Sequence, residues 1–153
     1  MITQLPISTH ASQKRDVRTQ FAALCYRVNK KGNHKVLLVT SRGTGRWIVP
    51  KGWPMDGRTP AGAAAQEAWE EAGVRGTTQG LCLGLYSYQK WLGRAEPLSI
   101  AVLVYPLAVT EMADDFPEQG QRQRRWFSPA KAAKNVHEPE LARILHEFRP
   151  DAV

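Results

Sequence analysis

The sequence predicts an α/β fold in which a mixed sheet of several strands carries a short central helix and a C-terminal helix. Apolar runs rich in β-branched and aromatic residues recur between residues 21 and 107, which is typical of strands. Helix start and stop signals frame residues 60–72, and residues 138–148 show apolar positions at helical spacing. The predicted strands outnumber the predicted helices, which argues against a doubly wound fold.

Three strands are predicted in the first third of the chain. Residues 21–28 and 35–40 form the first two, and the VLLV run in the second indicates burial on both faces. A turn rich in Asn, Gly and Lys separates them at 29–34. A loop with two glycines at 41–45 then leads into a short apolar strand at 46–50, with the sequence RWIVP.

The helix at 60–72 has well-marked ends. Thr59 can cap its N-terminus, Pro60 suits the first helical position, and Gly73 stands where a helix stops. Five small residues share one face and predict close packing against the sheet. They are Ala61, Ala64, Ala65, Ala68 and Ala72.

The second half of the chain predicts a hairpin followed by two helices. Residues 81–89 and 98–107 are the strands of the hairpin, and the acidic segment 110–120 is interpreted as a solvated loop rather than a second metal site. The elements that follow are a strand beginning at Trp126 and helices at 128–134 and 138–148.

Length and composition predict a single globular domain at residues 17–148, after a flexible N-terminal tail at 1–16. The net charge of +7 indicates a polyanionic partner. No apolar run approaches the length of about 18 residues that a membrane span needs, and no secretory signal is evident. Cys25 and Cys82 lie in apolar runs, so we expect buried free thiols and a reducing cytoplasm.

Three carboxylates crowd one turn of the predicted helix, because Glu67, Glu70 and Glu71 stand at positions i, i+3 and i+4. Their mutual repulsion disfavours the helix, and the macrodipole disfavours anions near its C-terminus. A hard divalent cation held by carboxylate oxygens would compensate for both penalties. The alternative is a solvated acidic face, but the strand and glycine turn just before the helix favour a metal and phosphate site.

This segment resembles the Nudix box, whose family pattern is G-x5-E-x7-R-E-U-x-E-E-x-G-U, with U a bulky apolar residue. Gly52 matches the first glycine, and the three glutamates, Gly73 and Val74 match the later positions in register. Arg58 and Gln66 depart from the pattern, because they stand where the family has Glu and Arg, and Ala68 is smaller than the usual residue. The resemblance implies a Nudix-type α/β/α sandwich with the box helix at 60–72, and a metal-dependent pyrophosphohydrolase.

The chain is most similar to the diphosphoinositol polyphosphate phosphohydrolase branch of this family, over residues 17–147. The similar segments are Cys25-Tyr26-Arg27, 36–39, 46–50, the box and 124–127. The resemblance implies that Mg²⁺ or Mn²⁺ is bound by Glu67, Glu71 and the main-chain carbonyl of Lys51. Glu70 is predicted to be the general base or a ligand of a second metal ion.

Position in the branch and charge together suggest the residues that bind substrate phosphates. They are Arg18, Ser41, Arg42, Lys90, Arg94, Arg122 and Arg124. Arginine offers a bidentate fork to phosphate oxygens, and strand alternation predicts Arg122 and Arg124 on one face with Arg125 on the other.

The predicted substrate is a diphosphoinositol polyphosphate or a dinucleoside polyphosphate. The alternatives are a nucleotide-sugar or capped-RNA hydrolase, and a non-hydrolytic module that binds RNA or inositol phosphates. An adenine-containing substrate needs an aromatic or apolar slot, whereas an inositol polyphosphate needs cations on several sides, which the basic surplus weakly favours. Nucleic acid is a possible but not a favoured partner, and both a monomer and a homodimer are compatible with the sequence.

Overall fold

A computed structural model gives the arrangement of the chain and describes residues 4, 6, 18–91, 93 and 95–152. Most of the predicted tail at 1–16, together with Arg94, lies outside the described residues. The strands are β1 (Thr19–Val28), β2 (His34–Thr40), β3 (Trp47–Ile48), β4 (Lys51–Gly52), β5 (Val74–Thr78), β6 (Gly84–Lys90), β7 (Leu98–Met112) and β8 (Arg124–Phe127). The helices are α1 (Pro60–Ala72), α2 (Pro129–Asn135) and α3 (Pro139–Glu147), followed by the 3-10 turn η2 (Pro150–Ala152).

The strands form one mixed sheet with the central order β3-β2-β1-β7-β5. β1 and β7 run parallel through eight registered pairs, whereas β1 and β2 are antiparallel. β7 is long enough to pair with two strands in succession. Its first part pairs antiparallel with β6, and its last part pairs antiparallel with β5. The predicted hairpin of the two long strands is therefore confirmed, with β6 beginning at Gly84.

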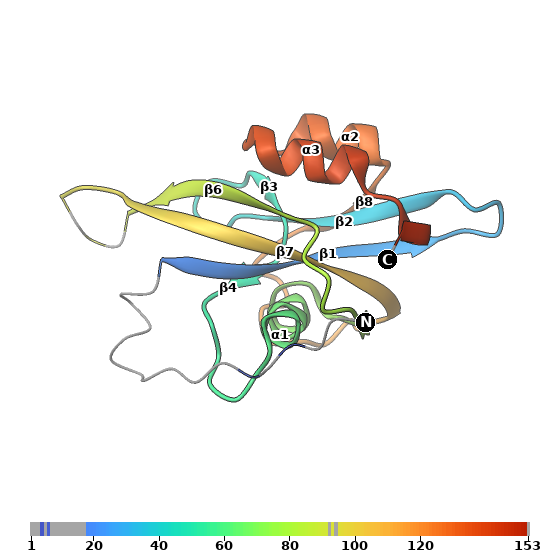
Figure 1. The fold of residues 1–153 in the computed structure, drawn as a ribbon, viewed down its shortest axis with the longest axis horizontal. Coiled ribbons are helices and arrows are strands. Elements are labelled where there is room, and N and C mark those ends of the chain that lie inside the picture. The colour runs from blue at the N-terminus through green and yellow to red at the C-terminus, as the bar shows by residue number, and fades with distance from the viewer. Residues whose placement is uncertain (1–3, 5, 7–17, 92, 94, 153) are drawn as a thin grey trace.

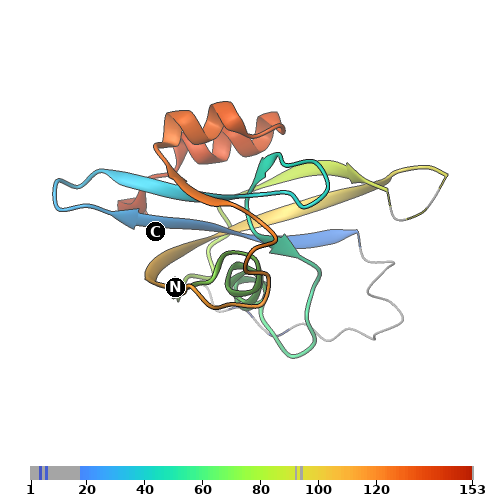
Figure 2. The same ribbon diagram turned by 180° about the vertical axis from the view of Figure 1, so that it is seen from behind.

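Helices cover both faces of this sheet. Figure 1 shows α2 and α3 together on one side and α1 alone on the other, and the reverse view in Figure 2 shows the same layers. Alternate residues of β1 serve the two cores, with Ala22 and Leu24 facing α3 and Phe21, Ala23 and Cys25 facing α1. The predicted α/β/α sandwich is confirmed.

The helix α1 begins and ends where the sequence predicts. The Thr59 hydroxyl accepts a hydrogen bond from the Gly62 amide at 3.0 Å, Pro60 opens the helix, and Gly73 closes it at φ +67°. The alanines of its inner face bring the helix backbone close to β1, and Ala64, Ala68 and Ala72 are fully buried there.

The predicted strand 46–50 is shorter in the structure, where it is β3 at Trp47–Ile48, and a second short strand, β4 at Lys51–Gly52, follows it. Ile48 pairs with Val39 of β2, whereas Lys51 pairs with Ala22 of β1, so the chain crosses from one strand to the next at Val49-Pro50. Proline lacks a backbone donor, which is compatible with this interruption of the ladder. The crossing brings Gly52 beside Phe21 of β1 and opposite Glu67 of α1.

Two predictions about this half of the fold were wrong. The predicted loop 110–120 begins as strand, because β7 continues to Met112 where it pairs with β5. β5 itself was not predicted, since its VRGTT sequence contains a glycine and one apolar residue. Cys82 was predicted to be buried but is exposed, because it precedes β6 in a segment without regular structure.

Replacing Gly73 with alanine should destabilise the fold by about 2–4 kcal/mol. The backbone at Gly73 is left-handed, which alanine disfavours, and the new Cβ would overlap the Phe116 ring. Gly32→Ala is the matched control, since Gly32 also has a positive φ of +84° but has open space at its Cβ position. Urea unfolding measures both variants. Equal losses of stability would show that Phe116 adds nothing to the cost.

Candidate active site

The site is built where α1 faces the strand β4. Gly52 is required there, because a Cβ at this position would overlap the carboxylate of Glu67. Glu71 lies one turn further along the same helix, has a solvent exposure of 6% and leaves its Oε1 atom buried with no hydrogen-bond partner. The sheet and helix therefore hold a buried carboxylate and a partly buried one near each other.

Burial and mutual repulsion make these carboxylates unusually basic. Burial, followed by the charges of Glu71 and Glu70, raises the pKa of Glu67 to about 8. Burial also raises the pKa of Glu71, although the cations Arg122 and Lys51 oppose this effect. A buried pair of this kind binds either a proton or another cation in preference to remaining doubly charged.

Arg122 is the cation nearest the carboxylate pair. Its Nη2 atom lies 3.9 Å from Glu71 Oε1, its Nε donates to Glu118 Oε1 at 3.0 Å, and its Nη1 donates to the Thr40 carbonyl at 3.1 Å. The Arg122 side chain is 9% exposed, so these contacts fix the guanidinium at the edge of β2. One guanidinium shared between two glutamates leaves the site with an excess of carboxylate.

The side chain of Lys51 also enters this region. Burial lowers its pKa to about 8, although the Glu71 charge acts in the opposite direction. Its Nζ atom lies 5.0 Å from the centre of the Tyr88 ring, and the Tyr88 hydroxyl donates to the buried Gln20 side chain at 2.6 Å. The sequence suggested only the main-chain carbonyl of Lys51 as a ligand, whereas its side chain adds positive charge to the same cleft.

The donor set fits a hard divalent cation. Carboxylate oxygens with raised proton affinity, one of them without a partner, are suitable ligands for Mg²⁺ or Mn²⁺. Within the described residues, no three acidic, histidine or cysteine side chains are gathered closely enough to hold an ion by themselves. An ion at this position would therefore need ligands beyond a carboxylate trio, and Mg²⁺ typically keeps several waters and binds substrate phosphates.

A cleft of about 660 Å³ opens over these carboxylates. Its charged lining consists of Arg42, Lys51, Lys90, Arg122, Glu67, Glu70, Glu71 and Glu118. Its aromatic and apolar lining consists of Ile48, Trp53, Tyr88 and Trp91, and the polar residues include Gln20, Ser41, Thr44 and Gln89. The cleft is therefore contributed by β1, the loop after β2, β3, β4, α1, β6 and the segment before β8.

Several residues predicted to bind substrate come together in this cleft, namely Ser41, Arg42, Lys90 and Arg122. Arg42 also contacts Glu118, with its Nη1 atom 3.8 Å from Glu118 Oε1. The same Nη1 donates a hydrogen bond to Gln121 Oε1 at 2.9 Å. Arg18 is exposed and does not line the cleft. The structure therefore gathers four of the six suggested residues that it describes.

Arg124 has a different position from Arg122, although the two share a face as strand alternation predicts. Its Nη1 donates to the Ala72 carbonyl at the end of α1 at 2.7 Å, and its guanidinium lies over Phe116. Arg125 lies on the opposite face, over Trp47 and Phe127. Arg124 does not line the cleft and instead ties the end of the box helix to β8.

Sequence reasoning missed several residues of the cleft. Glu118 was assigned to a solvated acidic loop, yet it stands four positions before Arg122 and pairs with it. The spacing of four residues between Glu118 and Arg122 was the signal in the sequence that could have identified this ion pair. Gln20, Trp53, Tyr88 and Trp91 carried no such signal, because only the tertiary structure shows that they line the same cleft.

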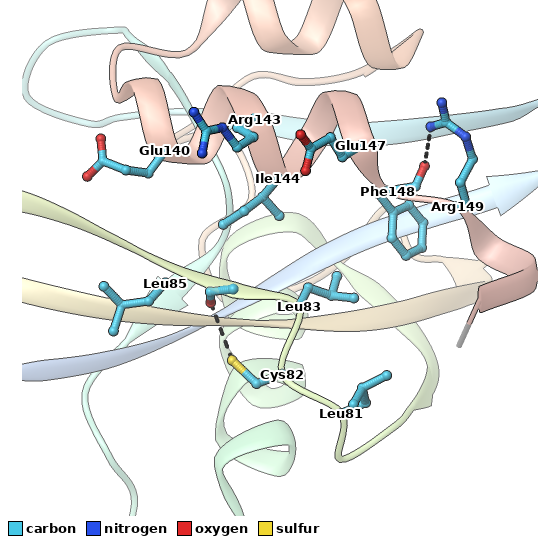
Figure 3. A pocket seen from close by; sticks show the side chains of 11 residues that line it. Leu81, Cys82, Leu83, Leu85, Glu140, Arg143, Ile144, Glu147, Phe148 and Arg149 are labelled. Carbon is cyan, nitrogen blue, oxygen red and sulfur yellow. Dashed lines mark hydrogen bonds between the residues drawn. The ribbon is translucent and has the colours of Figure 1, made fainter.

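A second groove of about 590 Å³ lies between the start of β6 and α3 (Figure 3). Leu81, Leu83, Leu85 and Ile144 give it apolar walls, and Glu140, Arg143 and Glu147 project from α3 along its rim. The exposed Cys82 thiol donates to the Gly84 carbonyl at 3.3 Å. This groove lacks the buried carboxylate pair, so the candidate chemistry belongs to the cleft at α1.

The geometry agrees with comparisons against known proteins. The NUDIX domain model matches residues 18–148. The chain belongs to the NUDIX family. Diphosphoinositol polyphosphate phosphohydrolase 2 of Rattus norvegicus is 32% identical over 148 residues, which cover 94% of this chain and 78% of that relative. The predicted assignment to the Nudix hydrolases, as a pyrophosphohydrolase, is confirmed.

Solved structures support the fold alone. The Ap4A hydrolase of C. elegans matches with a TM-score of 0.58 and 22% identity, covering 86% of this chain and 96% of that one. The dihydroneopterin triphosphate pyrophosphohydrolase of E. coli matches with a TM-score of 0.64 and 15% identity, covering 88% and 97%. Nudix hydrolases generally use divalent metal ions, and the carboxylate pair of this Nudix hydrolase fits that chemistry.

Arg58 and Gln66 stand where the family pattern has Glu and Arg, and within the described residues their side chains form no bond with each other in place of that pair. In the described structure, no hydrogen bond or ion pair joins the side chains of Arg58 and Gln66. Arg58 is exposed and Gln66 is partly buried, so neither leaves an isolated charge in the core. The loop before α1 is instead ordered by local contacts, including the hydrogen bond from the Arg58 amide to the Met55 carbonyl at 3.1 Å.

Without divalent ions, Glu67 should make the protein less stable as the pH rises from about 5 to 8. The ordinary pKa of 4.5 is raised to about 8 in the fold, so the folded chain retains a proton that the unfolded chain has lost. Over this range the pKa difference corresponds to about 4 kcal/mol for a fully buried group, and solvent screening of the partly exposed Glu67 reduces it. Urea unfolding in EDTA should therefore show a loss of about 2 kcal/mol in the wild type relative to Glu67→Gln.

Magnesium provides the second arm of this test. Adding Mg²⁺ at pH 8 should stabilise the wild type, because the ion replaces the proton between the carboxylates, and should stabilise Glu67→Gln much less. Identical responses of the two proteins to pH and to Mg²⁺ would contradict the assignment of Glu67.

Proposed function

We propose that the protein hydrolyses phosphoanhydride bonds in a polyphosphorylated small molecule, with Mg²⁺ or Mn²⁺ as its cofactor. The observation that carries the proposal is the close pair of the buried Glu71 and the partly buried Glu67, which lines a cleft that also holds Arg42, Lys90 and Arg122. Carboxylates suit the metal and the cations suit the phosphates, so one cleft supplies both kinds of ligand.

Glu67, Glu71 and the main-chain carbonyl of Lys51 would hold the ion. When bound, such an ion supplies Lewis acidity to the phosphate oxygens and favours deprotonation of a water molecule. Gly52 contributes by allowing the Glu67 carboxylate to approach the backbone of β4. Arg122 contributes by fixing Glu71 and Glu118 on the floor of the cleft.

Glu70 acts as the general base in this proposal. It lines the cleft on the same helical turn as the carboxylate pair, while its main-chain carbonyl accepts a hydrogen bond from the Glu118 amide at 2.9 Å. The absence of a three-carboxylate cluster among the described side chains favours this role over that of a third ligand. Glu70 takes the proton of the attacking water as the P–O bond of the anhydride breaks and the phosphate leaves.

Substrate phosphates not attacked by water are held by Arg42, Lys90 and Arg122. Arg42 comes from the loop after β2 and Arg122 from the segment before β8, and both lie beside the Glu118 carboxylate. Ser41 offers a hydroxyl at the same edge. The relatives named as diphosphoinositol polyphosphate phosphohydrolases support a substrate with several phosphates, of the diphosphoinositol or dinucleoside polyphosphate type.

A non-hydrolytic binding module is the second candidate, since Arg58 and Gln66 depart from the box. The retained carboxylate pair and Glu70 favour the enzyme, because a phosphate-binding module gains nothing from buried anions. Metal-dependent release of phosphate across inositol pyrophosphates, dinucleoside polyphosphates and nucleotide sugars separates the two functions.

We further propose that the protein acts in the cytoplasm. The two cysteines among the described residues are unpaired, which supports a reducing compartment. No helix of the described chain has the length and hydropathy to cross a membrane.

Replacing Glu71 with glutamine should abolish metal-dependent hydrolysis, with a loss of about a hundredfold or more in kcat. The fold should survive, because glutamine keeps the shape and removes a buried charge that has no hydrogen bond at Oε1. Steady-state kinetics with circular dichroism measure both effects. Near-normal turnover would remove Glu71 from the metal site.

Replacing Glu70 with glutamine should lower kcat by about 10²- to 10⁴-fold while changing KM little, because a general base acts on the chemical step. Steady-state kinetics of the variant and the wild type measures both parameters. A rise in KM with kcat preserved would assign Glu70 to substrate binding instead.

A further inference from the structure

A row of charges runs along the rim of the second groove. Glu140, Arg143 and Glu147 follow one another on α3, and Arg149 continues the row just after the helix (Figure 3). All four side chains are exposed, and within the described chain none of them takes part in an ion pair. Their spacing of three and four residues on α3 allows ion pairs within the helix, so the charges are left available although partners stand nearby.

Beneath this row the groove is apolar. Leu81 and Leu85 are 42% and 54% exposed, while Leu83 and Ile144 are partly buried against the core. Single exposed apolar residues are ordinary on a protein surface, but two exposed leucines in one groove of about 590 Å³ form a patch. An apolar centre with a charged rim is the usual anatomy of a protein–protein interface.

The order of the rim charges indicates which partner fits. From residue 140 to residue 149 the rim is negative, positive, negative and positive. A second copy of the chain that lies antiparallel presents the same charges in reverse order, so each carboxylate faces a guanidinium. Glu140 then lies opposite Arg149 of the other copy and Arg143 lies opposite Glu147, and two-fold symmetry repeats both pairs. A parallel copy would place like charges together.

The apolar residues agree with the same symmetry. The midpoint of the charge row falls beside Ile144, which places this side chain next to the two-fold axis. Figure 3 shows Leu85 below Glu140 and Leu81 towards the other end of the row. An antiparallel copy therefore brings Leu81 opposite Leu85, with Leu83 near its own symmetry mate.

We propose that the second groove is the interface of a two-fold symmetric homodimer, in which α3 lies antiparallel to α3 of a second copy. The groove is lined by 11 residues. A standard interface uses about 20–30 residues from each partner, so the dimer is weak, with a micromolar rather than a nanomolar dissociation constant. No residue lines both this groove and the cleft at α1, so the dimer leaves the candidate active site open and does not depend on the hydrolase function.

Charge exchange across the groove tests the proposal, with sedimentation velocity of the full chain from about 1 to 500 µM as the measurement. The wild type should form dimers as its concentration rises. Arg143→Glu should raise the dimer dissociation constant by about tenfold or more, because two symmetry-related attractions become repulsions, and Glu147→Arg should do the same. The double variant Arg143→Glu/Glu147→Arg should return to within about threefold of the wild type, because both pairs form again with their signs exchanged.

Lys30→Glu is the matched control. Lys30 is exposed in the turn between β1 and β2, lies outside the groove and forms no ion pair among the described residues. Its replacement changes the net charge as much as Arg143→Glu does and should leave the dissociation constant unchanged. The proposal is overturned if the wild type stays monomeric at the highest concentration, if both substitutions weaken the dimer equally, or if the double variant is no better than the single ones.

Cysteine cross-linking supplies an independent measurement. Cys82 is exposed and lines the groove next to Leu83, whereas Cys25 is buried, so a short bis-maleimide reagent reacts at Cys82. The wild type should give a covalent dimer, Cys82→Ser should give none, and Arg143→Glu should give much less. Circular dichroism checks that each variant is folded. Cross-linking that persists undiminished in folded Arg143→Glu would contradict the proposed interface.

Discussion

The site depends on the repulsion between two glutamates that the fold holds close together, one of them buried and the other partly buried. Glu67 and Glu71 share one turn of α1, and Glu71 is 6% exposed. An isolated helix would spread these charges into solvent, so their burial has to be enforced by packing. The energetic cost is offset in part by Arg122 and Lys51, and the remaining excess of negative charge supports the proposal that a divalent cation binds here.

The rest of the fold serves to hold this helix against the sheet. Small side chains on the inner face of α1 allow a close approach to β1, and Gly52 removes the side chain that would occupy the position of the Glu67 carboxylate. Arg124 bonds the last carbonyl of the helix and Gly73 turns the chain immediately afterwards. The strand crossing at Val49-Pro50 places β4 beside β1 and opposite α1, so α1, β1 and β4 meet at the carboxylates.

The parts that could be predicted from the sequence are those with local causes. The bounds of α1 follow from Thr59, Pro60 and Gly73, and these signals act within a few residues. The glutamates and Gly52 followed from the spacing of the box. β5 could not be predicted, because its VRGTT sequence has little apolar pattern and its strand state depends on pairing with β7.

Charge and position in the sequence did not separate the arginines of the same basic run. Arg122 reaches the cleft, whereas Arg124, on the same face, caps the end of α1, and only the tertiary structure decides between these roles. Trp91 was missed for the same reason, since it follows β6 in a loop whose position depends on distant strands, whereas the spacing of Glu118 to Arg122 was a local signal.

The most direct test of the account is a crystal of the protein soaked in Mn²⁺ and measured at a wavelength that gives anomalous scattering from manganese. The account predicts an anomalous peak within coordination distance of Glu67, Glu71 and the main-chain carbonyl of Lys51. Absence of a peak there, with both carboxylates turned outward into solvent, would contradict it.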